Sequence, residues 1–256
     1  MKKILGTGAM IAGALLVAGS ALAADLKAPA PMLMKAPPPP VMTWTGCYVG
    51  GGAGYGLWNQ ESFAENAGGA TTAMATSGGR GWFGTASVGC DYQFNSNIVI
   101  GAFGDWDFGS IKGQFEPGGL DVVGTESEKW AWGAGGRIGW LVSPTFLTYF
   151  AGGYTQAHFD PINFSSATAP FAPSNVFLDS HTYNGWFLGS GFDYAISMLP
   201  AGFFLRTEYR YSTYQAADLP VLSVTTGLPV GTSAVNSKKF VQTVRSELVY
   251  RFNLFH

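Results

Sequence analysis

Two aspartates and three histidines are the residues whose chemistry could support catalysis. Asp105 and Asp107 lie two residues apart, and the histidines are His158, His181 and His256. Paired carboxylates with an imidazole can activate water, whereas a nucleophilic Ser or Cys needs a base within reach. The sequence contains no Gly-x-Ser-x-Gly elbow, and its arginines are suitable partners for both aspartates. We therefore expect structural ion pairs at these aspartates and no catalytic site; a hydrolase is the less favoured alternative.

The histidines also suggest a possible metal site. His158-x-Asp160 and Asp179-x-His181 are mirror images, so a hairpin that pairs the two histidines would also pair the two aspartates. Two imidazoles and two carboxylates could bind a divalent transition metal. Residues 160–180 contain three prolines and need not keep that register. Solvated loop histidines are the favoured reading, and we predict no metal and no cofactor.

The composition excludes several classes of protein. Only 12% of the 256 residues are charged, whereas 47% are hydrophobic and 15% are aromatic. Such a chain is too apolar to be disordered. The net charge of −2 and the scattered basic residues offer no stripe for phosphates, so nucleic-acid binding is not expected.

The first residues have the pattern of a secretory signal peptide. Lys2 and Lys3 precede an uncharged stretch from Ile4 to Ala21, and cleavage is expected between Ala23 and Ala24. Residues 24–43 are rich in proline and predict an extended periplasmic linker. We therefore expect a signal peptide over 1–23, the linker over 24–43 and a folded domain over 44–256.

That domain alternates apolar and polar residues with period two in eight segments. The predicted strands are Cys47–Trp58, Gly81–Phe94, Ile98–Ile111, Lys129–Val142, Thr145–Phe159, His181–Ile196, Gly202–Tyr214 and Lys238–Phe252. Short connections alternate with long ones near 59–80, 112–128, 160–180 and 215–237. Residues 138–157 carry no charge and are long enough for a membrane helix, but Ser143-Pro144 favours two strands joined by a turn.

Charged residues keep to one face of each predicted strand. Near the C-terminus, Leu248 and Tyr250 share one face, whereas Glu247 and Arg251 occupy the other. The apolar face is rich in aromatic residues, which is typical of the lipid-facing surface of an outer-membrane barrel. The charged face then points inward. The expected inward residues are Asp91, Asp105, Asp107, Arg137, Asp193, Arg206, Glu208, Arg210, Arg245, Glu247 and Arg251.

These patterns predict an all-β fold: an eight-stranded, antiparallel, up-and-down transmembrane β-barrel. A strand can cross lipid only when every backbone group is paired, and a closed barrel achieves this. Eight strands leave room for little besides the barrel's own side chains. We therefore expect the inward charges to form a plug, with a cross-strand ladder between residues 206–210 and 245–251.

The two cysteines lie in an oxidising compartment, where an even number is read as a disulfide. Cys47 and Cys90 share outward parity and lie at equal distances from a hairpin centre near Gly68-Gly69. We predict that they are bonded. Two free thiols are the alternative, because a bond between adjacent strands needs favourable geometry.

The chain resembles a known family. The signal peptide, the Pro-rich start, the opening Trp44-Thr45-Gly46-Cys47-Tyr48-Val49-Gly50-Gly51 and the closing Tyr250-Arg251-Phe252 are similar to small outer-membrane β-barrels of alphaproteobacteria, the outer-membrane immunogenic or porin-family barrels. Two departures are Cys47, where Phe is usual, and four residues after Phe252. Glu247 also replaces the usual Gly of the C-terminal assembly signal.

The resemblance implies a location and a role. We expect an outer-membrane protein in contact with lipids and lipopolysaccharide, whose Tyr250 and Phe252 are read by the barrel-insertion machinery. The implied role is envelope-structural and surface-exposed, and a narrow porin-like channel is the alternative. Loop residues that could meet an extracellular ligand are Phe63, Phe115, Phe171 and Val176.

Overall fold

The structure is a computed structural model that describes residues 43–65, 69–117 and 121–253. These residues belong to one compact unit spanning Val41–His256. The predicted signal peptide, and the predicted linker up to residue 42, lie outside the described residues. No helix in the described part of the chain is long and apolar enough to span a membrane.

The described chain forms eleven strands of one antiparallel sheet. The strands are β1 (Gly46–Glu65), β2 (Ala75–Gln93), β3 (Ile98–Phe115), β4 (Val122–Ser143), β5 (Phe146–Phe159), β6 (Ile162–Ser166), β7 (Pro173–Leu178), β8 (His181–Ala195), β9 (Phe203–Tyr214), β10 (Ala217–Ser223) and β11 (Pro229–Phe252).

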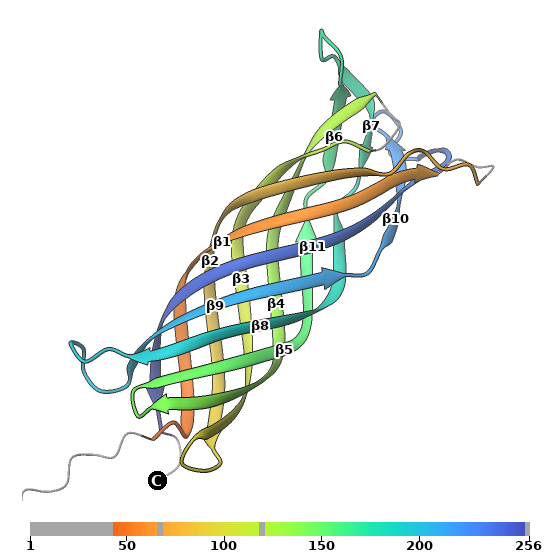
Figure 1. Cartoon of the computed structure of the whole chain (residues 1–256). Coiled ribbons are helices and arrows are strands. Elements are labelled where there is room, and N and C mark those ends of the chain that lie inside the picture. Colours follow the sequence, from red (N-terminus) through yellow and green to blue (C-terminus); the bar gives the residue numbers. More distant parts are fainter. Residues whose placement is uncertain (1–42, 66–68, 118–120, 254–256) are drawn as a thin grey trace, which may run out of the picture. The chain divides into compact units, whose positions relative to one another are not determined.

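Eight of these strands close into a ring. Hydrogen-bonded neighbours follow the order β1-β2-β3-β4-β5-β8-β9-β11, and β11 pairs with β1 (Figure 1). The closure pairs the backbone groups of both would-be edge strands, which confirms the predicted eight-stranded antiparallel ring. The uncharged stretch 138–157 forms the end of β4, a turn and most of β5. We call the end with the short connections 94–97, 144–145 and 196–202 the turn end, and the opposite end the loop end.

A second ring continues the wall at the loop end. There β6, β7 and β10 replace β5, β8 and β9, so that the order is β1-β2-β3-β4-β6-β7-β10-β11. The pairs Phe159–His181 and Ile162–Leu178 keep one register across the break between the rings. Pro161 interrupts the first long strand because it has no N–H to donate. Ser180 interrupts another, since its N–H is donated to Oδ1 of Asp179 (2.7 Å).

The prediction of loops over 160–180 and 215–237 is therefore wrong in part. Those segments contain β6, β7, β10 and the first third of β11. Prolines at positions 173 and 220 obscured the signal, because proline is depleted in strands and its tolerance there depends on the neighbouring strand. Strands of up to 24 residues also exceed the predicted length, so the predicted loops 59–80 and 112–128 are wrong in part as well: they contain the loop-end parts of β1, β2, β3 and β4.

Aromatic side chains form two belts on the outside of the barrel. The turn-side belt includes Tyr92, Trp140, Tyr194 and Tyr250, and the loop-side belt includes Trp82, Phe108, Trp130 and Trp186. On β2, β4 and β8 the two belts lie eight to ten residues apart. A tilted strand crosses the hydrocarbon core in roughly 9 to 11 residues. The belts are thus spaced to flank one membrane.

Apolar side chains close the interior at both ends. Near the turn end, the Trp44 and Phe204 rings lie 4.9 Å apart within a buried cluster that also contains Tyr48 and Leu147. Inside the second ring lies another buried apolar cluster. We call it the apolar cap; its members are Ala64, Phe115, Ile162, Phe164, Leu178, Leu219, Val221 and Val235.

Candidate functional site

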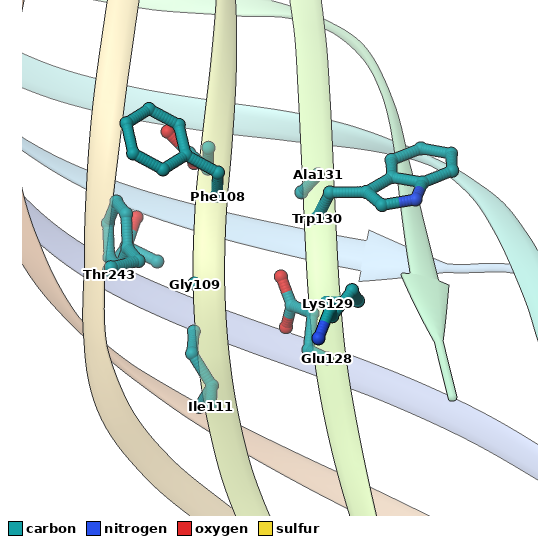
Figure 2. Close-up of a pocket in the computed structure, with 10 residues that line it drawn as sticks. Phe108, Gly109, Ile111, Glu128, Lys129, Trp130, Ala131 and Thr243 are labelled. Carbon is teal, nitrogen blue, oxygen red and sulfur yellow. The ribbon is translucent and has the colours of Figure 1, made fainter. Parts of the chain in front are cut away.

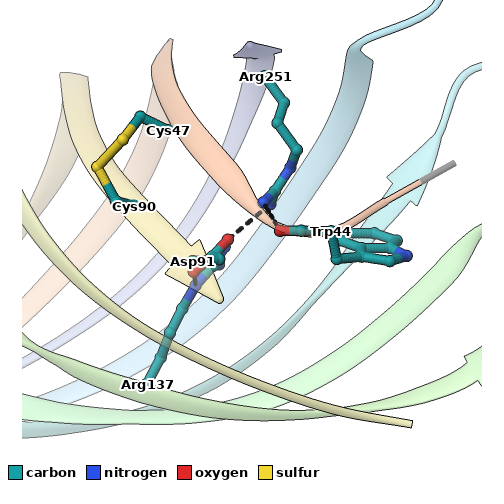
Figure 3. The surroundings of a disulfide bond; sticks show 6 residues. All are labelled: Trp44, Cys47, Cys90, Asp91, Arg137 and Arg251. Atoms are coloured by element: carbon teal, nitrogen blue, oxygen red, sulfur yellow. Dashed lines mark hydrogen bonds and ion pairs between the residues drawn. A yellow bond between two sulfur atoms is a disulfide. The ribbon is translucent and has the colours of Figure 1, made fainter. Parts of the chain in front are cut away.

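The lumen between these two clusters holds a network of buried ion pairs. Near the turn end, Asp91 is bound by Arg137 (Nε to Oδ1, 2.9 Å) and by Arg251 (Nη2 to Oδ2, 2.7 Å) (Figure 3). Asp193 accepts two hydrogen bonds from Arg206, at 2.7 and 2.9 Å, and a third from Arg137 at 3.2 Å. Three arginines and two aspartates from different strands therefore form one connected group.

A second group lies farther along the lumen. Arg210 makes a bidentate contact with Asp105, at 2.9 and 2.8 Å, and also binds Glu208 at 2.9 Å. Arg245 donates to Asp105 at 3.1 Å and to Asp107 at 3.1 and 2.8 Å. Bidentate arginine–carboxylate contacts are among the strongest hydrogen bonds in proteins, so these pairs hold three strands at fixed positions.

Aromatic rings fill the space beside the guanidinium groups. The Cζ of Arg206 lies 4.3 Å from the ring centre of Tyr48, and the Cζ of Arg137 lies 4.9 Å from the rings of both Tyr48 and Tyr149. The Tyr149 hydroxyl donates to Oε2 of Glu208 at 2.9 Å. Rings and ions together occupy the lumen, as expected for a barrel of eight strands.

The predicted cross-strand ladder forms only in part. β9 and β11 are neighbours, and Arg206 is paired in register with Glu247, but their charged atoms are 3.9 Å apart. Glu247 instead accepts a short hydrogen bond from Ser87 (2.6 Å). Arg245 reaches β3 rather than its register partner Glu208. In so narrow a lumen a long side chain reaches the far wall as easily as its neighbour, so several of the ion pairs connect strands that are not neighbours, such as Arg245 with Asp105 and Asp107.

Three buried charged residues were missed by the sequence analysis. Lys239 contacts Glu126 (2.5 Å) and Gln60, and its Nζ lies 4.2 Å from the ring centre of Phe159. Glu128 is buried beside them. Lys239 has the same inward parity as Arg245 and was detectable from the pattern. Glu126 and Glu128 fell in the predicted loop near 112–128, whereas β4 begins at Val122; a register shift between Glu128 and Trp130 also breaks the alternation that leads back from Arg137.

Buried charges of both signs are nearly balanced in the described chain. The buried acids are Asp91, Asp105, Glu126, Glu128, Asp193, Glu208 and Glu247; the buried bases are Arg137, Arg206, Arg210, Lys239, Arg245 and Arg251. The Asp107 side chain is 13% exposed. An ion removed from water is costly unless it is paired, so each member of this set depends on its partners.

The two aspartates singled out in the sequence make their described ion pairs with arginines. Asp105 and Asp107 are both held by Arg245, and no described hydrogen bond or ion pair joins either one to a histidine. His158 lies on the outside, stacked on Trp130 with ring centres 5.1 Å apart. His181 packs edge-on against Tyr183.

The hypothesis of a metal site at the histidines is wrong in its register. His158 is paired with Thr182, and His181 with Phe159, so the two imidazoles point to opposite faces of the wall. Nδ1 of His158 lies 2.9 Å from Oγ1 of Thr182. No cluster of three or more metal-binding side chains occurs among the described residues.

Cys47 and Cys90 are opposite each other on β1 and β2 and are joined by a disulfide (Figure 3). On its other side β1 pairs with β11, and there Cys47 is in register with Phe252. The disulfide therefore ties the first hairpin at the place where the first and last strands close the ring. Phe252 ends β11 and stacks with Tyr250, with ring centres 6.2 Å apart.

A closed ring, two aromatic belts and a charged, filled lumen are features of outer-membrane barrels. A model of the outer membrane protein beta-barrel domain matches residues 12–253. The chain belongs to this family. The resemblance found in the sequence is thus confirmed, and the outer membrane is the location of this barrel. Its turn end therefore faces the periplasm, and its loop end faces outward.

Known proteins similar to this barrel include the 31 kDa outer-membrane immunogenic proteins of Brucella melitensis and Brucella suis. Each is 26% identical over 250 residues, which cover 93% of this chain and 96% of the relative. Among solved structures, the outer membrane protein OprG from Pseudomonas aeruginosa is similar with a TM-score of 0.53 and 14% identity, covering 82% of this chain and 97% of OprG. At that identity the likeness concerns the fold.

Asp193 provides a test of the network. Replacing it with Asn removes the negative charge that faces Arg206 and Arg137 in a site with no exposed surface. Breaking a buried pair costs about 3–5 kcal/mol, so we expect the free energy of unfolding in urea to fall by that amount. Asp179→Asn, at an exposed position, is the matched control. Equal unfolding midpoints for the two variants would show that the network contributes nothing.

Proposed function

We propose that this protein is a closed, non-enzymatic barrel that anchors and displays its loop end at the cell surface. The observation that carries the proposal is the filled lumen. From the periplasmic end outward, the path meets the Trp44–Phe204 contact, the two arginine networks, the Lys239 contacts and the apolar cap. The paired carboxylates Asp105 and Asp107 in this series have arginine partners instead of a catalytic base.

The second ring supports a role in display. It lies beyond the loop-side belt, so it lifts the connections between strands away from the membrane. Phe171, at the tip of the β6–β7 hairpin, is 61% exposed. Phe115 is fully buried in the apolar cap, so its assignment as a loop contact is wrong. Phe63 and Val176 are partly buried.

A narrow channel is the second candidate. Charged residues of both signs line the lumen, as they would in a pathway for small polar solutes. The ion pairs argue against it, because opening a path would separate buried charges at a cost of several kcal/mol.

Conductance distinguishes the two candidates. We expect the reconstituted protein to give no single-channel steps in a planar bilayer. We also expect no steps from Arg245→Ala, because Arg210 still binds Asp105 and the apolar clusters still close the interior at both ends. Lys238→Ala, at an exposed position, should remain silent. Regular steps from the wild-type protein, altered by Arg245→Ala, would favour the channel.

Surface labelling tests display. In intact cells, a membrane-impermeant maleimide should modify Phe171→Cys, because its side chain is exposed at the loop end. Ser197→Cys, in an exposed turn at the other end, should react only after the outer membrane is permeabilised. The reverse pattern would show that the barrel is inserted upside down relative to our assignment.

The C-terminal aromatic tests assembly. We propose that Phe252, at the end of β11, is part of the signal read by the barrel-insertion machinery. Phe252→Ala should lower the amount of protein in the outer membrane several-fold, whereas Phe240→Ala, on the same face of β11, should not. Normal levels of Phe252→Ala would remove Phe252 from this role.

A further inference from the structure

Three exposed cations gather on neighbouring strands just beyond the loop-side belt. Arg80 on β2 is paired in register with Lys112 on β3, and Lys129 follows on β4. We call these three residues the basic patch. Among the described residues, the other lysines and arginines are the six buried in the lumen and Lys238 on β11. Three of the four cations on the outside of the described barrel thus lie together.

A β-bulge turns Lys129 outward. The register between β3 and β4 shifts between Phe108 and Ile111, and the register between β4 and β5 shifts between Glu128 and Trp130. Ala131 points inward, so simple alternation would place residue 129 inside the barrel. The bulge instead buries Glu128 and exposes Lys129 (Figure 2). Bulges are a common means of redirecting a side chain.

Within the part of the chain that the structure describes, the basic patch makes no ion pair. None of the ion pairs in the described chain includes Arg80, Lys112 or Lys129. Residues directly opposite on antiparallel strands have Cβ atoms about 4.5–5.5 Å apart, and like charges there are destabilising. The Arg80–Lys112 pair is therefore unfavourable in the protein alone, and an anion between the two groups would relieve it.

The position of the patch indicates which anion is available. Arg80 is two residues beyond Trp82, and Lys129 is next to Trp130, both in the loop-side belt. Trp side chains in such belts lie at the level of the lipid headgroups. The hydroxyls of Ser110 and Ser127 lie on the same strands and hydrogen-bond each other at 2.8 Å, which leaves one of the two O–H groups free to donate. Lys112 is paired in register with Ser127.

We propose that the basic patch binds the phosphate of an anionic lipid in the outer leaflet. Arg80 and Lys112 hold the phosphate between them, and Lys129 contributes charge from the other side. The acyl chains of that lipid extend from the patch over Phe108 and Trp130 into the membrane. The lipid site goes beyond the role of anchoring and display, because it does not depend on whether the lumen conducts.

Lipid binding to the folded protein tests the proposal. The full chain, in neutral detergent, is titrated with lipopolysaccharide and separately with phosphatidic acid, and bound lipid is measured by native mass spectrometry. A cation near an anionic lipid surface contributes about 1 kcal/mol, so the triple variant Arg80→Gln/Lys112→Gln/Lys129→Gln should bind roughly 100-fold more weakly. Lys238→Gln is the matched control, with an affinity within about twofold of wild type.

The single variant Lys112→Gln separates a ligand site from a structural role. It removes the like-charge pair, so its free energy of unfolding without lipid should equal or exceed that of the wild type, while its lipid affinity falls roughly fivefold. Retention of a heat-dependent shift on SDS gels shows that each variant is folded. The single variant also keeps the test valid if the triple variant does not fold.

Other outcomes would overturn the lipid site. Equal affinity of the wild type and the triple variant would show that the patch does not bind lipid. Equal binding of phosphatidylcholine, whose headgroup carries no net charge, would show that the contact is only hydrophobic. Displacement of the lipid by millimolar inorganic phosphate would show that the patch binds a free anion instead. A dissociation constant of about 1 mM corresponds to a binding free energy of roughly 4 kcal/mol.

Discussion

The closed ring of backbone hydrogen bonds is the constraint on which the rest of this structure depends. Lipid offers no partners to a strand, so β11 must pair with β1 and no edge can remain. Closing the ring with only eight strands leaves a lumen about as wide as its own side chains. Any charge placed inside is therefore removed from water and must find its partner across the lumen. The arginine networks are the consequence of the strand number.

The ion-pair networks also constrain the strand register of the ring. Asp193 on β8 contacts arginines of β4 and β9, and Asp105 on β3 contacts arginines of β9 and β11. The Asp193–Arg206 pair joins register partners on the neighbouring strands β8 and β9, whereas the other three ion pairs join strands that share no backbone hydrogen bonds. Since a buried charge without a partner is strongly unfavourable, a ring with shifted registers would leave several charges unpaired. The network selects one register among the many that an alternating sequence permits.

The bulges at the loop-side belt coincide with a change in the chemistry of the barrel's outer surface. Below them the outside is apolar and meets lipid, and above them it carries Arg80, Lys112 and Lys129. At the same height Glu128 turns inward beside the Lys239–Glu126 pair. One local irregularity in β4 therefore exchanges the faces of an acid and a base. Farther out, the second ring surrounds the apolar cap, which is a small hydrophobic core outside the membrane.

Much of the fold could be predicted because alternation with period two is a local property. Which face of a strand Arg206 or Asp193 occupies depends on the parity of its position, and the pairing of Cys47 with Cys90 follows from the symmetry of one hairpin. The strands β6, β7 and β10 were missed since they are short and contain or adjoin prolines. Glu126 and Glu128 were missed because they lay in the predicted loop near 112–128, where the β-bulge interrupts the alternation by which the strand could have been extended.

The sequence by itself determined the class of fold, the number of strands in the membrane ring, the outer-membrane location and the face on which most charges lie. Only the tertiary structure decided which charges meet, how the second ring closes and which cations share the patch. The physical reason is that partners across a lumen depend on the register of every strand between them. Parity is set within one segment, whereas register is set by the whole ring.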